Sequence, residues 1–155
     1  MMEVYTGIER YTEVAISMEN DIILNKIQSI ERCINRIRQV YDNNPANLAD
    51  YTKQDSIILN VERACETCID IAMNIVSQKK LGIPQSRADS FQILCDFGII
   101  DQDLADRMKA MVGFRNRAIH DYQTLNLEIV QRIIEEDLDD FLEFTSTIMK
   151  LLDQQ

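Results

Sequence analysis

Residues 23–41 read ILNKIQSIERCINRIRQVY, and this stretch decides the class of fold. Its apolar side chains recur at spacings of 4, 3, 4, 3 and 4 residues, which places them on one face of an α-helix. They are Ile23, Ile27, Ile30, Ile34, Ile37 and Tyr41. The stretch therefore predicts a long amphipathic helix, which Asn43, Asn44 and Pro45 bring to an end.

A second long helix is predicted over residues 52–80. Thr52 and Asp55 are typical of a helix start, because a hydroxyl accepts a hydrogen bond from a free amide and a carboxylate suits the positive end of a helix. Gly82 and Pro84 mark its end. Its expected buried face consists of Ile58, Val61, Cys65, Cys68, Ala72 and Ile75.

Three further helices are expected in the second half of the chain. A short one covers residues 86–97 and is closed by Gly98, another begins at Asp101, and the last one has Asn126 as its N-cap. No stretch alternates between apolar and polar residues as a β-strand does. The predicted fold class is therefore all-α, an antiparallel up-and-down bundle of four to five helices.

The length of 155 residues suits one domain. We divide the chain into residues 1–19, an N-terminal extension that is either helical or disordered, and residues 20–155, the helical-bundle domain. No apolar stretch is long enough to span a membrane, and residues 1–20 lack the apolar core of a secretory signal. We therefore expect a cytoplasmic protein with no membrane partner.

The chain is acidic, with 26 acidic and 16 basic side chains and a formal net charge of −10. This balance disfavours non-specific nucleic-acid binding through a broad basic surface, but it is compatible with a local basic cleft. Cys65 and Cys68 form a C-x-x-C pair inside a helical pattern, with no second pair or histidine pair at ligand spacing. We interpret these thiols as core residues rather than as a zinc or redox site, and we expect no metal and no cofactor.

The densest group of polar residues is GFRNRAIHDY at residues 113–122. It contains His120, the only histidine of the chain. One interpretation is an ordinary helix end, in which Arg117 and Asp121 form a surface ion pair at i and i+4. The other interpretation is a site in which a permanent cation, Arg115, works together with an imidazole that titrates near neutral pH.

This segment fits R-x4-H-x-Y, with Arg115, His120 and Tyr122 at the three fixed positions. Together with an all-α chain of this size it resembles the HEPN superfamily, and specifically its HepT-like toxin branch. The stretches QDSIILNVERACE (residues 54–66), LGIPQ (81–85) and MVGFRN (111–116) are also similar to this branch. The resemblance covers roughly residues 20–150.

The resemblance implies a metal-independent endoribonuclease, the toxin of a type VII-like toxin–antitoxin system. Arg115 and His120 would be the catalytic residues, and Asn116 and Arg117 would support them or bind RNA. Tyr122 would be adenylylated by the cognate minimal nucleotidyltransferase antitoxin, which neutralises the toxin. The expected substrate is RNA and not DNA, since internal attack requires a ribose 2′-OH. Partners would be the RNA, the antitoxin and a second copy of the chain.

Helix geometry constrains this site. Five residues at 100° each put Arg115 and His120 about 140° apart on an uninterrupted helix, so they cannot converge on one phosphate. Either the helix breaks between them, or two motifs face each other across a homodimer cleft, which the resemblance implies. Wide apolar faces fit either a dimer or well-buried helices; they include Ile22, Leu24, Ile57, Leu59, Ile133 and Leu142.

Two other functions remain compatible with the sequence. One is a non-catalytic HEPN module, the nucleotide- or substrate-binding subunit of a two-component nucleotidyltransferase. The other is a structural helical bundle without a ligand. The first shares the fold and the partner with the nuclease, so only the chemistry at Arg115 and His120 separates them.

Overall fold

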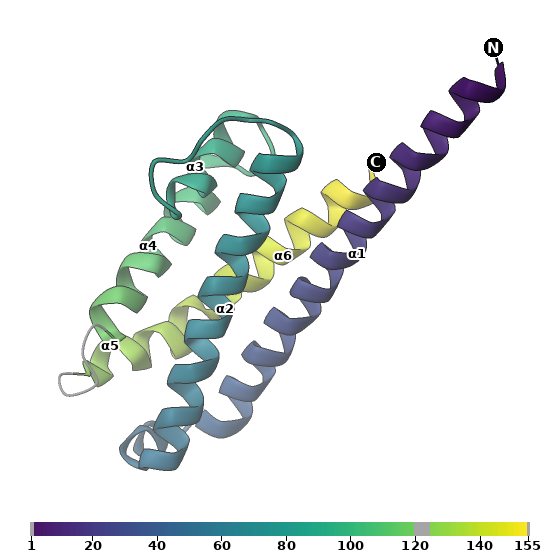
Figure 1. The fold of residues 1–155 in the computed structure, drawn as a ribbon. Helices are drawn as coiled ribbons and strands as arrows, with labels where there is room; N and C mark the ends of the chain where they lie inside the picture. Colours follow the sequence, from purple (N-terminus) through teal and green to yellow (C-terminus); the bar gives the residue numbers. More distant parts are fainter. Residues whose placement is uncertain (1, 120–124, 155) are drawn as a thin grey trace.

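The computed structural model describes residues 2–119 and 125–154, and within these ranges every regular element is a helix. The elements are α1 (Met2–Tyr41), η1 (Pro45–Ala49), α2 (Tyr51–Gln78), α3 (Asp89–Asp96), α4 (Gln102–Ile119), α5 (Leu127–Arg132), η2 (Ile133–Asp137) and α6 (Leu138–Asp153). In Figure 1, α1, α2, α4 and α6 run alternately up and down, and α3 lies at one end of α4. The predicted all-α antiparallel bundle is confirmed.

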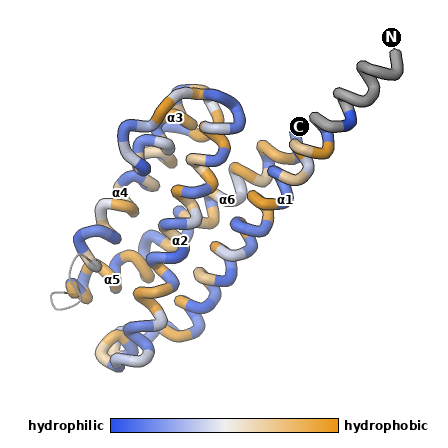
Figure 2. Tube along the Cα trace, in the orientation of Figure 1, coloured by the Kyte–Doolittle hydropathy of each residue, from blue (hydrophilic) through white to orange (hydrophobic). Residues whose placement is uncertain are grey.

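The core lies where the apolar faces of the helices meet. The stripe of α1 predicted from residues 23–41 is buried, as is the predicted face of α2. Phe91 of α3 and Phe144 of α6 meet edge to face, with ring centroids 5.4 Å apart. Figure 2 shows hydrophilic residues alternating with these apolar ones along each helix. Each fully buried isoleucine or phenylalanine contributes about 1.5–3 kcal/mol of transfer free energy, so this core holds the helices in place.

The end of α1 is where the sequence predicts it. Asp42 and Asn43 adopt left-handed φ angles of 51° and 52°, and the Asn44 side chain accepts a hydrogen bond from Ala46 N at 3.1 Å. The helix α2 begins within one residue of its predicted start, but the predicted capping residue, Thr52, is wrong. Its N-cap is Asp50, which accepts from Lys53 N at 3.1 Å, so Thr52 already lies inside the helix. The physical reason is that Asp50 leaves η1 with the extended backbone that an N-cap requires.

The last helix begins as predicted, because the Asn126 side chain accepts a hydrogen bond from Ile129 N at 3.3 Å. It is not one regular α-helix. Residues Ile133–Asp137 form the π-helical turn η2, which separates α5 from α6. The hydroxyl of Tyr41, at the end of α1, donates a hydrogen bond to Glu135 in this turn. This hydrogen bond therefore connects the π-helical turn to the end of α1.

The wide apolar faces have two different explanations. Ile57 and Ile133 are buried within the single chain, so there the width reflects a well-buried helix. Ile22 and Leu59 remain 51% and 44% exposed. The homodimer and the division at residue 20 stay predictions. No helix within the described residues is long and apolar enough to cross a membrane.

Candidate functional site

The last turns of α4 point two arginines in opposite directions. Residues two apart on an α-helix are about 160° apart around its axis. Arg115 accordingly faces α2, whereas the guanidinium of Arg117 stacks over the ring of Phe114, 4.9 Å from its centroid. Arg132 of α5 lies on the same ring, at 5.0 Å. The structure therefore separates Arg115 from Arg117.

The guanidinium of Arg115 is held by two neighbours. Its Nη1 donates a hydrogen bond of 2.8 Å to Asn116 Oδ1, and its Nη2 lies 3.7 Å from Glu66 Oε1 on α2. Its Nε is buried and has no hydrogen-bond partner among residues 2–119 and 125–154. The side chain as a whole is 27% exposed. Arg115 is thus an oriented cation whose side chain is partly accessible to solvent, although its Nε is not.

Glu66 connects this arginine to a chain of opposite charges. Its Oε2 is 2.8 Å from Arg87 Nη1, and Arg87 Nη2 is 2.9 Å from Asp70 Oδ1. Asp70 in turn lies 3.8 Å from Lys26 of α1. These side chains are a third to a half exposed, so each pair contributes less than about 1 kcal/mol to stability. The main effect of the chain is to orient Arg115.

Two of the predicted site residues, His120 and Tyr122, lie outside the described residues. Asp121, the expected ion-pair partner of Arg117, does too. Of the five predicted site residues the structure thus places three, and it brings Arg115 and Asn116 into direct contact. The pairing of Arg115 with His120 stays a prediction.

The thiols near Arg115 belong to the core. Cys65 and Cys68 are 2% and 1% exposed, which confirms their interpretation as packing residues. Burial raises the pKa of Cys65 to about 12, although the nearby Arg115 acts in the opposite direction, and burial raises the pKa of Cys68 well above its usual value. Within the part of the chain that the structure describes, no group of three or more His, Cys, Asp or Glu side chains is arranged to hold a metal ion.

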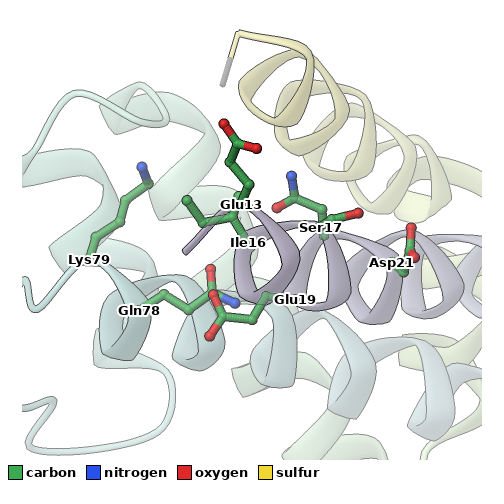
Figure 3. Close-up of a pocket in the computed structure, with 8 residues that line it drawn as sticks. Glu13, Ile16, Ser17, Glu19, Asp21, Gln78 and Lys79 are labelled. Carbon is green, nitrogen blue, oxygen red and sulfur yellow. The ribbon is translucent and has the colours of Figure 1, made fainter. Parts of the chain in front are cut away.

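A cavity of about 880 Å³ lies away from Arg115, between α1 and the end of α2. Figure 3 shows Glu13, Ile16 and Glu19 of α1 across from Gln78 and Lys79. Lys79 follows Glu66 by thirteen residues on α2, about 20 Å along a helix. This groove is therefore remote from Arg115, and its lining, with three carboxylates and one lysine, does not suit a phosphate.

Comparison with known proteins adds an independent line of evidence. Residues 30–148 match the family described as Ribonuclease HepT-like. The chain belongs to the HepT-like ribonuclease family. It is 54% identical over 129 residues to the mRNA nuclease HepT of Shewanella oneidensis, an alignment that covers 83% of this chain and 97% of that protein.

Two solved structures agree with this membership. The tri-AMPylated HEPN toxin of Shewanella oneidensis, in complex with an MNT antitoxin, superimposes on this HepT-like chain with a TM-score of 0.77. A toxin–antitoxin structure with AMP-PNP gives a TM-score of 0.79. Both are 52% identical in sequence, and each comparison covers 84% of this chain and 98% of the other. The resemblance to the HepT-like branch is confirmed.

Sequence reasoning did not single out Glu66 and Arg87 as site residues. Glu66 is the last residue of the stretch 54–66, which resembles the family. This position is the one feature of the nearby sequence that points to it. Its contact with Arg115 joins residues 49 positions apart and exists only because α2 packs against α4.

Proposed function

We propose that this HepT-like protein is a metal-independent endoribonuclease that acts in the cytoplasm as the toxin of a type VII-like toxin–antitoxin pair. The observation that carries the proposal is the guanidinium of Arg115, which Asn116 and Glu66 orient while the side chain stays 27% exposed. A planar cation of this kind can hold two oxygens of one phosphate.

The chemistry follows from the residue types. His120 accepts the proton of a ribose 2′-OH, and the 2′-oxygen attacks the adjacent phosphorus. The bond from phosphorus to the 5′-oxygen breaks, and a protonated imidazole supplies a proton to that oxygen. The products are a 2′,3′-cyclic phosphate and a 5′-hydroxyl. Arg115 neutralises the charge that develops on the phosphorane, and Asn116 keeps Arg115 in position.

A second copy of the chain completes the site in this proposal. One regular helix cannot bring Arg115 and His120 to the same phosphate. Of the two solutions, a break in the helix or a pair of motifs, this proposal takes two motifs that meet across a homodimer cleft, as the family resemblance implies. Two imidazoles then become available, one as base and one as acid. The exposed Ile22 and Leu59 are compatible with such an interface. Arg117 lies on the opposite side of α4, where it would bind RNA backbone or the antitoxin.

Regulation is proposed to act through Tyr122. The support is the Shewanella oneidensis toxin, which is tri-AMPylated and bound to an MNT antitoxin. In this chain a cognate minimal nucleotidyltransferase would add AMP to the Tyr122 hydroxyl. The added phosphates would place negative charge beside Arg115 and compete with the RNA phosphate.

The nuclease is tested with purified full-length protein and labelled RNA in the presence of EDTA. Cleavage by the unsubstituted protein, lost in Arg115→Ala and in His120→Ala, supports the proposal. Arg38→Ala is the matched control, because Arg38 pairs with Asp139 at 2.8 Å, away from the site. RNA with 2′-deoxyribose at the cleaved position must resist. Equal cleavage by all variants indicates a contaminant, and no cleavage of diverse RNAs contradicts the nuclease.

Modification is tested by co-expression with the nucleotidyltransferase followed by intact-mass analysis. A mass gain in whole AMP units that disappears in Tyr122→Phe supports the proposed site. A gain that persists in Tyr122→Phe rules out Tyr122. Light scattering on the same preparations tests the homodimer, which a monomeric but fully active nuclease would contradict.

A further inference from the structure

A second group of cations lies between α1 and α2, outside the site described above. A cavity of about 590 Å³ is lined by Arg32 and Arg36 from α1 and by Arg63 from α2. Most of the remaining lining is neutral and polar; it includes Asn35, Gln39 and Asn60. Among the residues that the structure describes, no carboxylate and no large apolar side chain lines this cavity.

The three arginines line the same cavity. Arg32 and Arg36 stand one turn apart on one face of α1, and Arg63 faces them from α2. Cys33 lies between them in the lining. Both Arg63 and Arg32 are close enough to act on its thiol, whose pKa burial nevertheless raises overall. The cavity therefore has cationic groups on both walls.

These charges are not neutralised within the structure. Among the residues that it describes, no carboxylate pairs with any of the three arginines, although acidic residues outnumber basic ones by 26 to 16. The contact that Arg36 does make is a hydrogen bond of 3.5 Å to the neutral Gln39. Three uncompensated cations around a concave surface favour an anion.

The lining indicates which kind of anion binds. Protein–protein interfaces are anchored by buried aromatic or aliphatic side chains, and this cavity has none. Nucleic-acid backbones are held by arginine together with serine, asparagine and glutamine, the side-chain types present here. The volume also falls in the range of about 300–1,000 Å³ that is typical of small-ligand pockets.

The position of the cavity relative to Arg115 also favours a nucleic-acid backbone as the ligand. Arg63 precedes Glu66 by three residues on α2, about 4.5 Å along the helix axis, and Glu66 is the residue that contacts Arg115. The cavity and Arg115 therefore lie at one level of α2, on the sides that face α1 and α4. Residues three apart on a helix are neighbours on its surface, with Cβ atoms about 5–6 Å apart, a separation that one extended RNA strand can cross.

We propose that Arg32, Arg36 and Arg63 form a subsite for a backbone phosphate of the RNA strand whose scissile phosphate is held by Arg115. The inference rests on the proposed nuclease function and adds to it a binding determinant beyond the motif. The subsite reads no base, so it strengthens RNA binding without changing which sequence is cut.

The test measures fluorescence anisotropy of a labelled single-stranded RNA oligonucleotide with full-length protein that carries His120→Ala, which prevents cleavage. Arg63→Ala, and separately Arg32→Ala with Arg36→Ala, are compared with the matched control Arg38→Ala. Arg38 lies on the same helix and its loss changes the net charge equally, but its side chain pairs with Asp139. Arg63→Lys tests rescue by a conserved charge.

We expect Arg63→Ala to weaken binding about three- to tenfold and to reduce the slope of log affinity against log salt by about 0.7, the value for one phosphate contact on a single strand. Arg38→Ala should bind as the parent does, and Arg63→Lys should recover most of the affinity. Circular dichroism must show an unchanged fold. Equal affinities in the pocket variants and in Arg38→Ala, or no RNA binding by the parent, overturn the subsite.

The same variants, made in the protein with His120 intact, separate this inference from the nuclease proposal. If the unsubstituted chain fails to cleave RNA, but Arg63→Ala weakens binding, the subsite stands and the nuclease fails. If RNA affinity is unchanged and the complex with the nucleotidyltransferase weakens instead, the pocket binds an acidic protein surface and the inference is wrong. A change in oligomeric state without loss of RNA affinity overturns it in favour of a dimer interface.

Discussion

Glu66 Oε1 lies 3.7 Å from Arg115 Nη2, while the other oxygen of the same carboxylate lies 2.8 Å from Arg87 Nη1. One carboxylate thus holds two arginines, one from α4 and one from the segment before α3. The contact with Arg115 is the longer of the two, so a phosphate group can replace it at low cost. In the proposed nuclease, Glu66 would therefore be a positioning residue, which acts on the RNA through Arg115.

The first prediction concerns Glu66→Gln, which keeps the shape of the side chain but removes its charge. We expect kcat for RNA cleavage to fall about two- to fivefold, in line with the 0.5–1 kcal/mol of a partly exposed pair. KM should not rise, because a negative charge near the phosphate is lost. Steady-state kinetics on a defined RNA measure both constants.

The matched control is Glu62→Gln, one turn earlier on α2, which removes the same charge without a contact to Arg115. Thermal unfolding of both variants should resemble that of the parent. Equal kcat in all three proteins, or a rise in KM alone, would contradict the positioning role.

The second prediction concerns the four cysteines. Burial raises the pKa of Cys33, Cys65 and Cys68, so their thiols stay protonated and shielded at neutral pH, whereas Cys95 is only partly buried. Brief treatment of the folded protein with iodoacetamide should therefore modify Cys95 first, by at least about tenfold in rate. Peptide mass spectrometry identifies the site. Rapid labelling of Cys65 together with Cys68 would instead favour the reactive C-x-x-C interpretation.

The third prediction concerns Tyr41, whose hydroxyl donates to Glu135 in η2. Burial, assisted by Glu135, raises its pKa to about 12. A raised pKa means that this group contributes stability below about pH 10, the usual tyrosine value, and that the contribution disappears as the pH rises through 12. Tyr41→Phe should cost about 1 kcal/mol in urea unfolding at neutral pH.

The alkaline part of this prediction is checked by phenolate absorbance. One tyrosine of the parent should ionise later than the rest, and that late step should be missing in Tyr41→Phe. Identical alkaline titrations of the two proteins, apart from one fewer group of ordinary pKa, would show that Tyr41 is not held in this way.

The fold could be predicted because periodicity reports directly which residues are buried. The 4-3-4 spacing of residues 23–41 fixed one helix face, and the cap at Asn126 fixed the start of the last helix. The capping residue of α2 could not be predicted in the same way. Asp50 is its N-cap because this residue follows η1 with an extended backbone. No periodic pattern of apolar residues in the sequence predicts η1.

The π-helical turn and the site contacts escaped prediction for another reason. Both depend on packing between segments that are remote in sequence, as the contacts of Glu135 with Tyr41 and of Glu66 with Arg115 show. The motif identified Arg115 and Asn116, whose mutual contact is local. The 100° step of a helix is enough to predict that Arg117 and Arg115 point in different directions. It does not predict which of the two faces the bundle, because the segment is dense in polar residues.

The fourth prediction uses Arg107, which joins α4 to α6. Its Nη1 lies 2.7 Å from Asp140 and 2.6 Å from Glu143, and its Nη2 lies 2.9 Å from Asp103. Because these groups are partly exposed, Arg107→Gln should cost about 1–2 kcal/mol in the free energy of unfolding at pH 7. Urea unfolding measures this cost. Arg38→Gln is the matched control, since it removes an exposed pair with Asp139 and should cost less than about 0.5 kcal/mol.

The cost of Arg107→Gln should shrink on acidification. The hydrogen bond from Arg107 lowers the pKa of Glu143, so this pair stabilises the fold above about pH 4.3, the usual glutamate value, and its contribution is lost as the pH falls through the lowered pKa. Burial raises the pKa of Asp137, which acts with the opposite sign, but Asp137 is present in both proteins and cancels from the difference. Unfolding free energies of parent and variant should therefore converge from about pH 5 downwards. A difference that stays constant down to pH 3 would show that Arg107 stabilises the bundle by packing rather than through Glu143.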